Sequence, residues 1–227
     1  MKRFTLIMVL VTLSLLAKSQ NLQLHYDFRT DRNYLTTTVE NFVPDAHGST
    51  FFFVDFNYSA NGPIEAYWEI ARELKNWDAP FSVHVEYNGG LGNGYFINNA
   101  YLLGGTYALN AADFSKGISF SAMYKYIQEN PSPNNFQLTA VWYMNMLNNK
   151  LSFTGFADLW REKHTTSNDG FVADFQDAEY VFLSEPQLWY NFNQKFSVGT
   201  EVEFSYNFGA MPGFNVFPTI GAKWTFN

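Results

Sequence analysis

The sequence of 227 residues predicts an all-β protein: a transmembrane antiparallel up-and-down β-barrel of about twelve strands. Three observations lead to this expectation. The chain starts with an export signal, it is 19% aromatic although its mean hydropathy is only −0.20, and turn residues separate alternating stretches along its length. An exported chain that is aromatic-rich yet polar on average is typical of a membrane barrel, because each strand has one side in lipid and the other in water.

The first residues have the layout of a secretory signal peptide. Lys2 and Arg3 form a charged start, Phe4–Leu16 is apolar, and Ala17 and Ser19 are small residues before a cleavage site. The apolar run is too short and wrongly flanked for a membrane anchor, which is the alternative interpretation. The expected organisation is a signal peptide over residues 1–19 and a barrel over residues 20–227, in the outer membrane of a Gram-negative bacterium.

Charge and cysteine content narrow the possible partners. The sequence contains no cysteine, so it forms no disulfide and offers no thiol for a lipid after the signal. Its formal net charge is −7, which disfavours a nucleic-acid partner because phosphates require a basic surface. We expect outer-membrane lipid and a small solute as partners, no nucleic acid, and a monomeric protein.

The expected strands lie between the turns and have about the 9–11 residues that a tilted spanning strand needs. Ile64–Asn76 also fits an amphipathic helix, but apolar residues at every second position favour a strand. In chain order the expected strands are 21–29, 34–43, 50–59, 64–76, 81–88, 99–111, 117–126, 136–147, 150–162, 180–192, 195–208 and 214–227.

The connections alternate between short and long, as they do in outer-membrane barrels. Short turns are expected at Asp113–Lys116, Asn148–Asn149 and Asn193–Gln194. The glycine-rich stretch "GGLGNG" lacks the strand–turn–helix context of a phosphate-binding loop and is interpreted as flexible. Pro186 within a strand predicts a bulge or an irregular inner wall. Long loops are expected at residues 88–98, 127–135, 162–179 and 209–213.

The stretch "TFFFVDFNYS", Thr50–Ser59, shows how the two faces are assigned. It carries aromatic residues on both faces and one acid, Asp55. A carboxylate that faces lipid at mid-depth is costly, so Asp55 must face the lumen and its neighbours Val54 and Phe56 the lipid.

The same alternation gives a lumen rich in carboxylates and aromatic rings, with few bases. About twelve strands enclose a narrow lumen. Aromatic rings could stack a flat base, and carboxylates could accept hydrogen bonds from sugar hydroxyls, so a nucleoside is the expected solute. The residues expected to select the solute are Phe53, Asp55, Glu86, Lys125 and Tyr143.

From Asn21 to Asn227 the chain resembles the Tsx family of nucleoside-specific outer-membrane channels. The resemblance rests on the order of four stretches, "YFINNAYLLG", "ISFSAMYKYIQ", "NNKLSFTGFADLW" and "GAKWTFN". It implies a narrow twelve-stranded barrel whose lumen binds nucleosides through aromatic and ionisable side chains. The loops here are shorter, and the ligand residues of that family do not align one to one.

Other chemistries have weaker support in the sequence. Ser82, His84 and Glu86 share one strand face, which suggests a lipid-cleaving barrel enzyme, but that face points inward and the spacing is long for a Ser–His hydrogen bond. His25 and Asp27 could give only two metal ligands, so neither a metal nor a cofactor is expected. The function expected is passive conduction without catalysis; a lipid-modifying enzyme, a plugged structural or adhesive barrel, and a soluble lipocalin-like binder are the alternatives.

Overall fold

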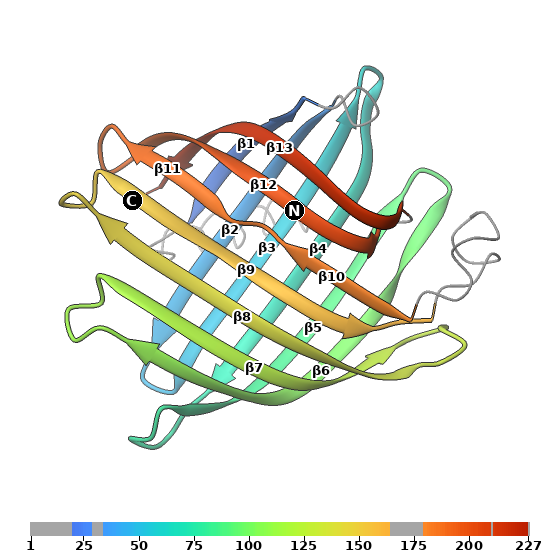
Figure 1. Ribbon diagram of the computed structural model, residues 1–227, viewed down its shortest axis with the longest axis horizontal. Helices are drawn as coiled ribbons and strands as arrows, with labels where there is room; N and C mark the ends of the chain where they lie inside the picture. Colours follow the sequence, from blue (N-terminus) through green and yellow to red (C-terminus); the bar gives the residue numbers. More distant parts are fainter. Residues whose placement is uncertain (1–19, 29–33, 164–178, 210, 227) are drawn as a thin grey trace, which may run out of the picture.

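The computed structural model describes residues 20–28, 34–163, 179–209 and 211–226 (Figure 1). The expected signal peptide, residues 1–19, lies outside these ranges and stays a prediction. Within the described residues, no helix is long and apolar enough to cross a membrane.

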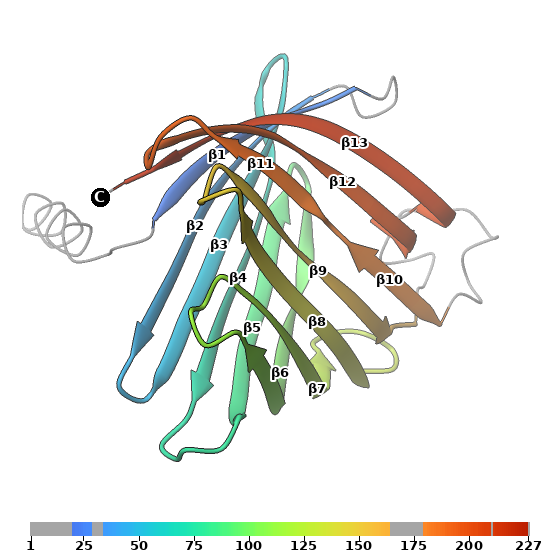
Figure 2. The same ribbon diagram turned by 60° about the vertical axis from the view of Figure 1, so that its left-hand side comes forward.

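The described residues form an antiparallel sheet that closes into a barrel (Figures 1 and 2). Its strands follow one another around the wall in chain order, and the first strand pairs with the last. The strands are β1 (Asn21–Asp27), β2 (Leu35–Asp45), β3 (Gly48–Ser59), β4 (Gly62–Leu74), β5 (Phe81–Gly92), β6 (Tyr95–Asn110), β7 (Lys116–Ile127), β8 (Asn134–Met146), β9 (Leu151–Arg161), β10 (Tyr180–Ser184), β11 (Gln187–Asn191), β12 (Phe196–Phe208) and β13 (Met211–Thr225).

The wall has twelve positions because β10 and β11 are two halves of one strand. Both halves pair with β9 on one side and with β12 on the other. The break falls at Glu185 and Pro186, where proline cannot donate a ladder hydrogen bond. The expected twelve-stranded antiparallel barrel is therefore confirmed, and the irregularity expected at Pro186 is confirmed with it.

The segment Ile64–Asn76, which also fitted a helix, is a strand. It forms most of β4 and pairs with β3 and β5 along its length. Tight turns also occur where they were expected, between β6 and β7, between β8 and β9, and between β11 and β12.

Two predictions of long loops, at residues 88–98 and 209–213, are wrong. The glycine-rich stretch is not a flexible loop, because β5 continues to Gly92 and β6 begins at Tyr95, leaving Asn93 and Gly94 as the turn. Gly90 and Gly92 pair with both β4 and β6, which holds them extended. The last strand likewise begins at Met211 rather than Phe214. By contrast, residues 128–133 do form a loop between β7 and β8, as expected.

The two faces of each strand follow the expected alternation. In β1, Leu22, Leu24 and Tyr26 are exposed on the outside, whereas Gln23 and His25 are buried inside the barrel. The closing strand also turns Trp224 outward. A continuous apolar outer surface and a polar inner surface are what a barrel in a bilayer requires.

Candidate solute-binding lumen

One part of the lumen is filled by packed side chains. Trp189 on β11, Phe217 on β13 and Val181 on β10 have no exposed surface. Lys223 on β13 lies over an indole ring here, with its ammonium 4.3 Å from the Trp189 ring. Outside these strands, the Lys125 ammonium on β7 is 4.4 Å from the Trp160 ring on β9. Such cation–π contacts hold the charged groups against the wall. We call the inner surface of β10–β13 the packed wall.

The opposite part of the lumen stays accessible. Inward-facing side chains of β2, β3 and β4 alternate along each strand, and none of them is buried. This surface, which we call the open wall, carries mainly acids and rings: Glu40, Phe51, Phe53, Asp55, Glu65, Tyr67, Glu69 and Glu73. The space that a solute could use therefore lies beside a surface of carboxylates and aromatic rings.

The first group of side chains that meets across the lumen centres on Glu69. Its carboxylate accepts a hydrogen bond from the Tyr67 hydroxyl at 2.6 Å. It also interacts electrostatically with Glu86 on β5, Lys125 on β7 and Asp158 on β9. Because β4 and β9 are far apart around the wall, the lumen is narrow at this level. We call Glu69, Glu86 and Asp158 the central carboxylates.

A second group lies around Asp55. The Thr38 hydroxyl donates a hydrogen bond to Asp55 at 2.5 Å, and Asp55 interacts electrostatically with Glu40. Glu201, on β12, reaches both Asp55 and Glu40 electrostatically, and the Gln187 side chain donates a hydrogen bond to it at 2.5 Å. Carboxylates thus approach one another from opposite walls at a second point.

The structure brings together four of the five residues expected to select the solute. The Phe53 ring lies 5.9 Å from the Tyr67 ring, and Tyr67 is paired with Asp55 across β3 and β4. Through the Tyr67–Glu69 hydrogen bond this surface connects with Glu86 and Lys125.

Tyr143 does not belong to this group. It lies opposite Gly117, eight residues from Lys125 along β7, which is about 26 Å at the rise of a strand. Its hydroxyl donates to Asn110 at 2.9 Å, near the turn that follows β6. Tyr143 therefore lines the mouth of the barrel on the side of the short turns.

The sequence alone does not single out the residues that complete the group. Glu69 and Asp158 fit the inner face as acids, but nothing in the sequence marks them as partners of Glu86. Tyr67, which links the rings to the carboxylates, is likewise only one inner aromatic residue among several. The alternation places each of them on the inner face, but the sequence carries no signal for which strands face each other across a closed barrel.

The inward-facing trio on β5 does not form a hydrolase site. Ser82 donates its hydroxyl hydrogen bond to Glu73 on β4, not to His84. His84 lies between two carboxylates, 2.6 Å from Glu73 and 2.9 Å from Glu86. A serine nucleophile needs a hydrogen bond to its base, and here the base is bonded to acids on both sides. No group of three or more described His, Asp or Glu residues could hold a metal ion.

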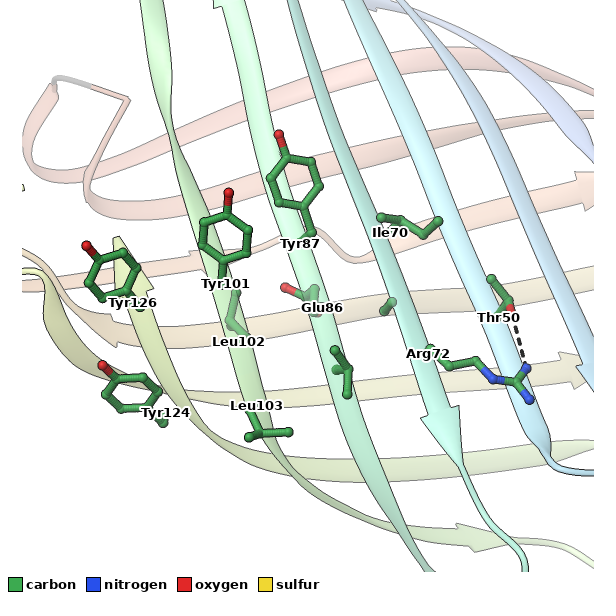
Figure 3. Close-up of a pocket in the computed structure, with 12 residues that line it drawn as sticks. Thr50, Ile70, Arg72, Glu86, Tyr87, Tyr101, Leu102, Leu103, Tyr124 and Tyr126 are labelled. Carbon is green, nitrogen blue, oxygen red and sulfur yellow. Dashed lines mark hydrogen bonds between the residues drawn. The ribbon is translucent and has the colours of Figure 1, made fainter. Parts of the chain in front are cut away.

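The outer face carries a belt of tyrosines. Figure 3 shows Tyr87, Tyr101 and Tyr126 side by side, with their hydroxyls pointing to the same end of the barrel. They line a shallow, apolar groove with Tyr124 and Leu103. Tyrosines at this position suit the boundary between lipid tails and headgroups. The groove faces outward and is therefore separate from the lumen.

The fold and the polar lumen define an outer-membrane-type β-barrel with the architecture of porins. Two solved structures share it over nearly their whole length. The "NanC porin" is 11% identical, with 91% of this chain and 100% of that chain covered and a TM-score of 0.60. The "KdgM porin" is 12% identical, with 92% and 99% covered and a TM-score of 0.54. At this identity, the likeness concerns the fold.

The chain belongs to a family described as "Domain of unknown function (DUF5020)", whose model matches residues 19–226. No curated protein matches the sequence. The KdgM porin has also been solved "in complex with disordered oligogalacturonate", with a TM-score of 0.53 to this chain. The Tsx-like nucleoside specificity is not among these findings.

Proposed function

We propose that the protein is a passive channel for small solutes in the outer membrane, with nucleosides as its first candidate solutes. The observation that carries this proposal is the asymmetry of the lumen. Side chains of β2–β4 remain accessible along the strands, while the packed wall fills the other side. A passage that is narrow and lined by many weak contacts lets a solute enter and leave.

The chemistry of the open wall supports a neutral, ring-bearing solute. Phe53 and Tyr67 offer ring faces for stacking, and Asp55 and Glu69 accept hydrogen bonds from sugar hydroxyls. The same carboxylates repel anions. An acidic sugar such as the oligogalacturonate of the KdgM complex is therefore disfavoured as a solute here, although the fold is shared.

Swelling of liposomes that contain the refolded protein tests this proposal. Uridine, a neutral sugar of similar size and galacturonate would be compared. We expect uridine to enter fastest and galacturonate slowest. Entry of uridine and the neutral sugar at equal rates would contradict nucleoside preference but keep the channel. Entry of none of them would contradict the channel and favour a plugged barrel or an enzyme.

The double substitution Phe53→Ala and Asp55→Asn tests the residues. It removes one ring and one charge from the open wall, so the preference for uridine over the sugar should be lost. Unchanged preference would contradict the assignment. Heat-modifiable migration on a gel verifies that the variant is folded.

We further propose that the chain is cleaved after residue 19 and that the barrel is a monomer in the membrane.

A further inference from the structure

The central carboxylates outnumber the cations around them. Glu69 and Asp158 each interact electrostatically with Glu86, and Lys125 is the lysine that reaches both. The Lys125 ammonium donates to Gln137 at 2.8 Å and lies over the Trp160 ring, so it is held against its own side of the lumen. His84 is held between Glu73 and Glu86. Carboxyl groups thus converge on the lumen and outnumber the described cations beside them.

In the described part of the chain, Asn88 adds an unsatisfied acceptor beside these carboxyl groups. Asn88 lies directly opposite Glu69 across β4 and β5, and two residues after Glu86 on the same strand face. Its side chain is buried, with 5% of the residue exposed, and its Oδ1 atom has no hydrogen-bond partner among the described residues. A buried carbonyl oxygen without a partner is costly, and such groups are rare in native structures.

The backbone beside Asn88 is irregular. The register between β5 and β6 shifts between Asn88 and Gly90, so that an extra residue of β6 lies opposite Gly89. Bulges of this kind re-aim side chains and are frequent next to functional sites. Asp158, on the other side of the lumen, accepts a side-chain hydrogen bond from Thr139, but its Oδ1 atom is buried and has no partner among the described residues.

The Oδ1 atoms of Asn88 and Asp158 lack a donor among the described residues. Carboxylate and carbonyl oxygens accept hydrogen bonds, and a primary ammonium group supplies three donors together with a positive charge. Aromatic rings continue the surface from this point, through Tyr67 to Phe53 and then Phe51, with ring centres 5.9 and 6.0 Å apart. These rings suit the apolar or aromatic part of a molecule that carries such an ammonium group.

We propose that Asn88 and the central carboxylates form a binding site for the primary ammonium group of an amine-bearing solute. The inference rests on the proposed channel only in that the solute reaches the site through the lumen. It names a class of solute that differs from a neutral nucleoside by its charge.

Titration calorimetry with the refolded protein in detergent tests the site without requiring conduction. Phenethylammonium and 2-phenylethanol are matched probes, because they share the ring and the chain length and differ in the charged group. We expect the amine to bind at least about tenfold more tightly, as hydrogen bonds between charged groups are worth at least a decade in affinity. Equal binding of the two probes, or no binding of the amine, would overturn the proposal.

Two variants and a control locate the site. Asn88→Leu removes the unpartnered oxygen and should lower amine affinity about tenfold. It should leave the unfolding midpoint unchanged or higher, because a buried polar group without a partner is replaced by an apolar one. Glu69→Gln should also weaken the amine. Asp113→Asn removes a charge in the turn after β6 and should bind the amine as the unaltered protein does.

The outcomes separate this inference from the proposed function. Amine affinity that survives both Asn88→Leu and Glu69→Gln overturns the ammonium site, whatever the liposomes show. A protein that admits solutes but does not discriminate amine from alcohol keeps the channel and loses the site. A protein that binds the amine as expected but admits no solute keeps the site and loses the channel.

Discussion

The open wall and the packed wall face each other in one barrel, yet their inward-facing side chains differ in burial and in chemistry. On β2–β4 the inward-facing carboxylates and rings retain exposed surface. On β10–β13, Trp189, Phe217 and Ser205 have none, and Lys223 is held over the Trp189 ring. One barrel of twelve strands can therefore combine a closely packed stretch of wall with a stretch whose polar and aromatic side chains stay accessible to a solute.

The largest expected difference between the walls concerns stability. Trp189→Ala should lower the free energy of unfolding by about 3–5 kcal/mol, because it leaves a large cavity in fully packed surroundings. Phe53→Ala on the open wall should cost no more than about 1 kcal/mol, since its surface is only partly buried. Urea unfolding in detergent, followed by gel migration, measures both. Equal losses would mean that the two walls are packed alike.

The next effect concerns charge selectivity. In planar bilayers with a salt gradient, the reversal potential should indicate preference for cations, because the carboxylates of the open wall concentrate them. Asp55→Asn combined with Glu69→Gln should reduce the ratio of cation to anion permeability by a factor of at least about 2. Asp78→Asn with Asp113→Asn removes two charges in the connections after β4 and β6 and serves as the matched control. A ratio that is changed equally by both pairs would contradict the open wall as the source of selectivity.

The smallest expected effect concerns Tyr143. Tyr143→Phe removes one hydrogen bond, to Asn110, and costs about 0.5–1.5 kcal/mol of stability at most. It should leave the preference for uridine over a sugar unchanged, because Tyr143 lies about 26 Å along the strand from Lys125. Liposome swelling checks this. A change as large as that of the Phe53 and Asp55 double variant would place Tyr143 back within the selective stretch.

Much of the fold could be predicted because lipid and water impose a period of two on every strand. The inward position of Asp55 follows from the cost of a charge in lipid, and the break at Pro186 follows from its missing donor. Tight turns rich in asparagine were equally clear. At Asn148 and Asn149 the backbone has positive φ angles of 55° and 65°, a conformation that asparagine tolerates.

Other features could not be predicted, for physical reasons. The strand ends around "GGLGNG" and at Met211 looked like loops, since glycine and proline have low strand propensity and only pairing with neighbours holds them extended. The meeting of Glu86 with Asp158 depends on how the strands stagger as the barrel closes. Alternation identifies the face that a residue occupies but not its position along the barrel axis. Tyr143 was grouped with Lys125 because both face the lumen, although they lie at different levels of it.

The most direct test of the central claim is the reactivity of a single cysteine on each wall. The protein has no cysteine of its own, so every reaction reports the introduced thiol. Thr38→Cys places it on the open wall and Ser205→Cys on the packed wall, where Ser205 has no exposed surface. A water-soluble, cationic methanethiosulfonate would be applied to each folded variant.

We expect Thr38→Cys to react quickly and to lose solute entry once modified, because the reagent then occupies the passage. Ser205→Cys should react only after unfolding. Equal reaction rates, or faster reaction at Ser205→Cys, would contradict the division of the lumen into an open and a packed wall.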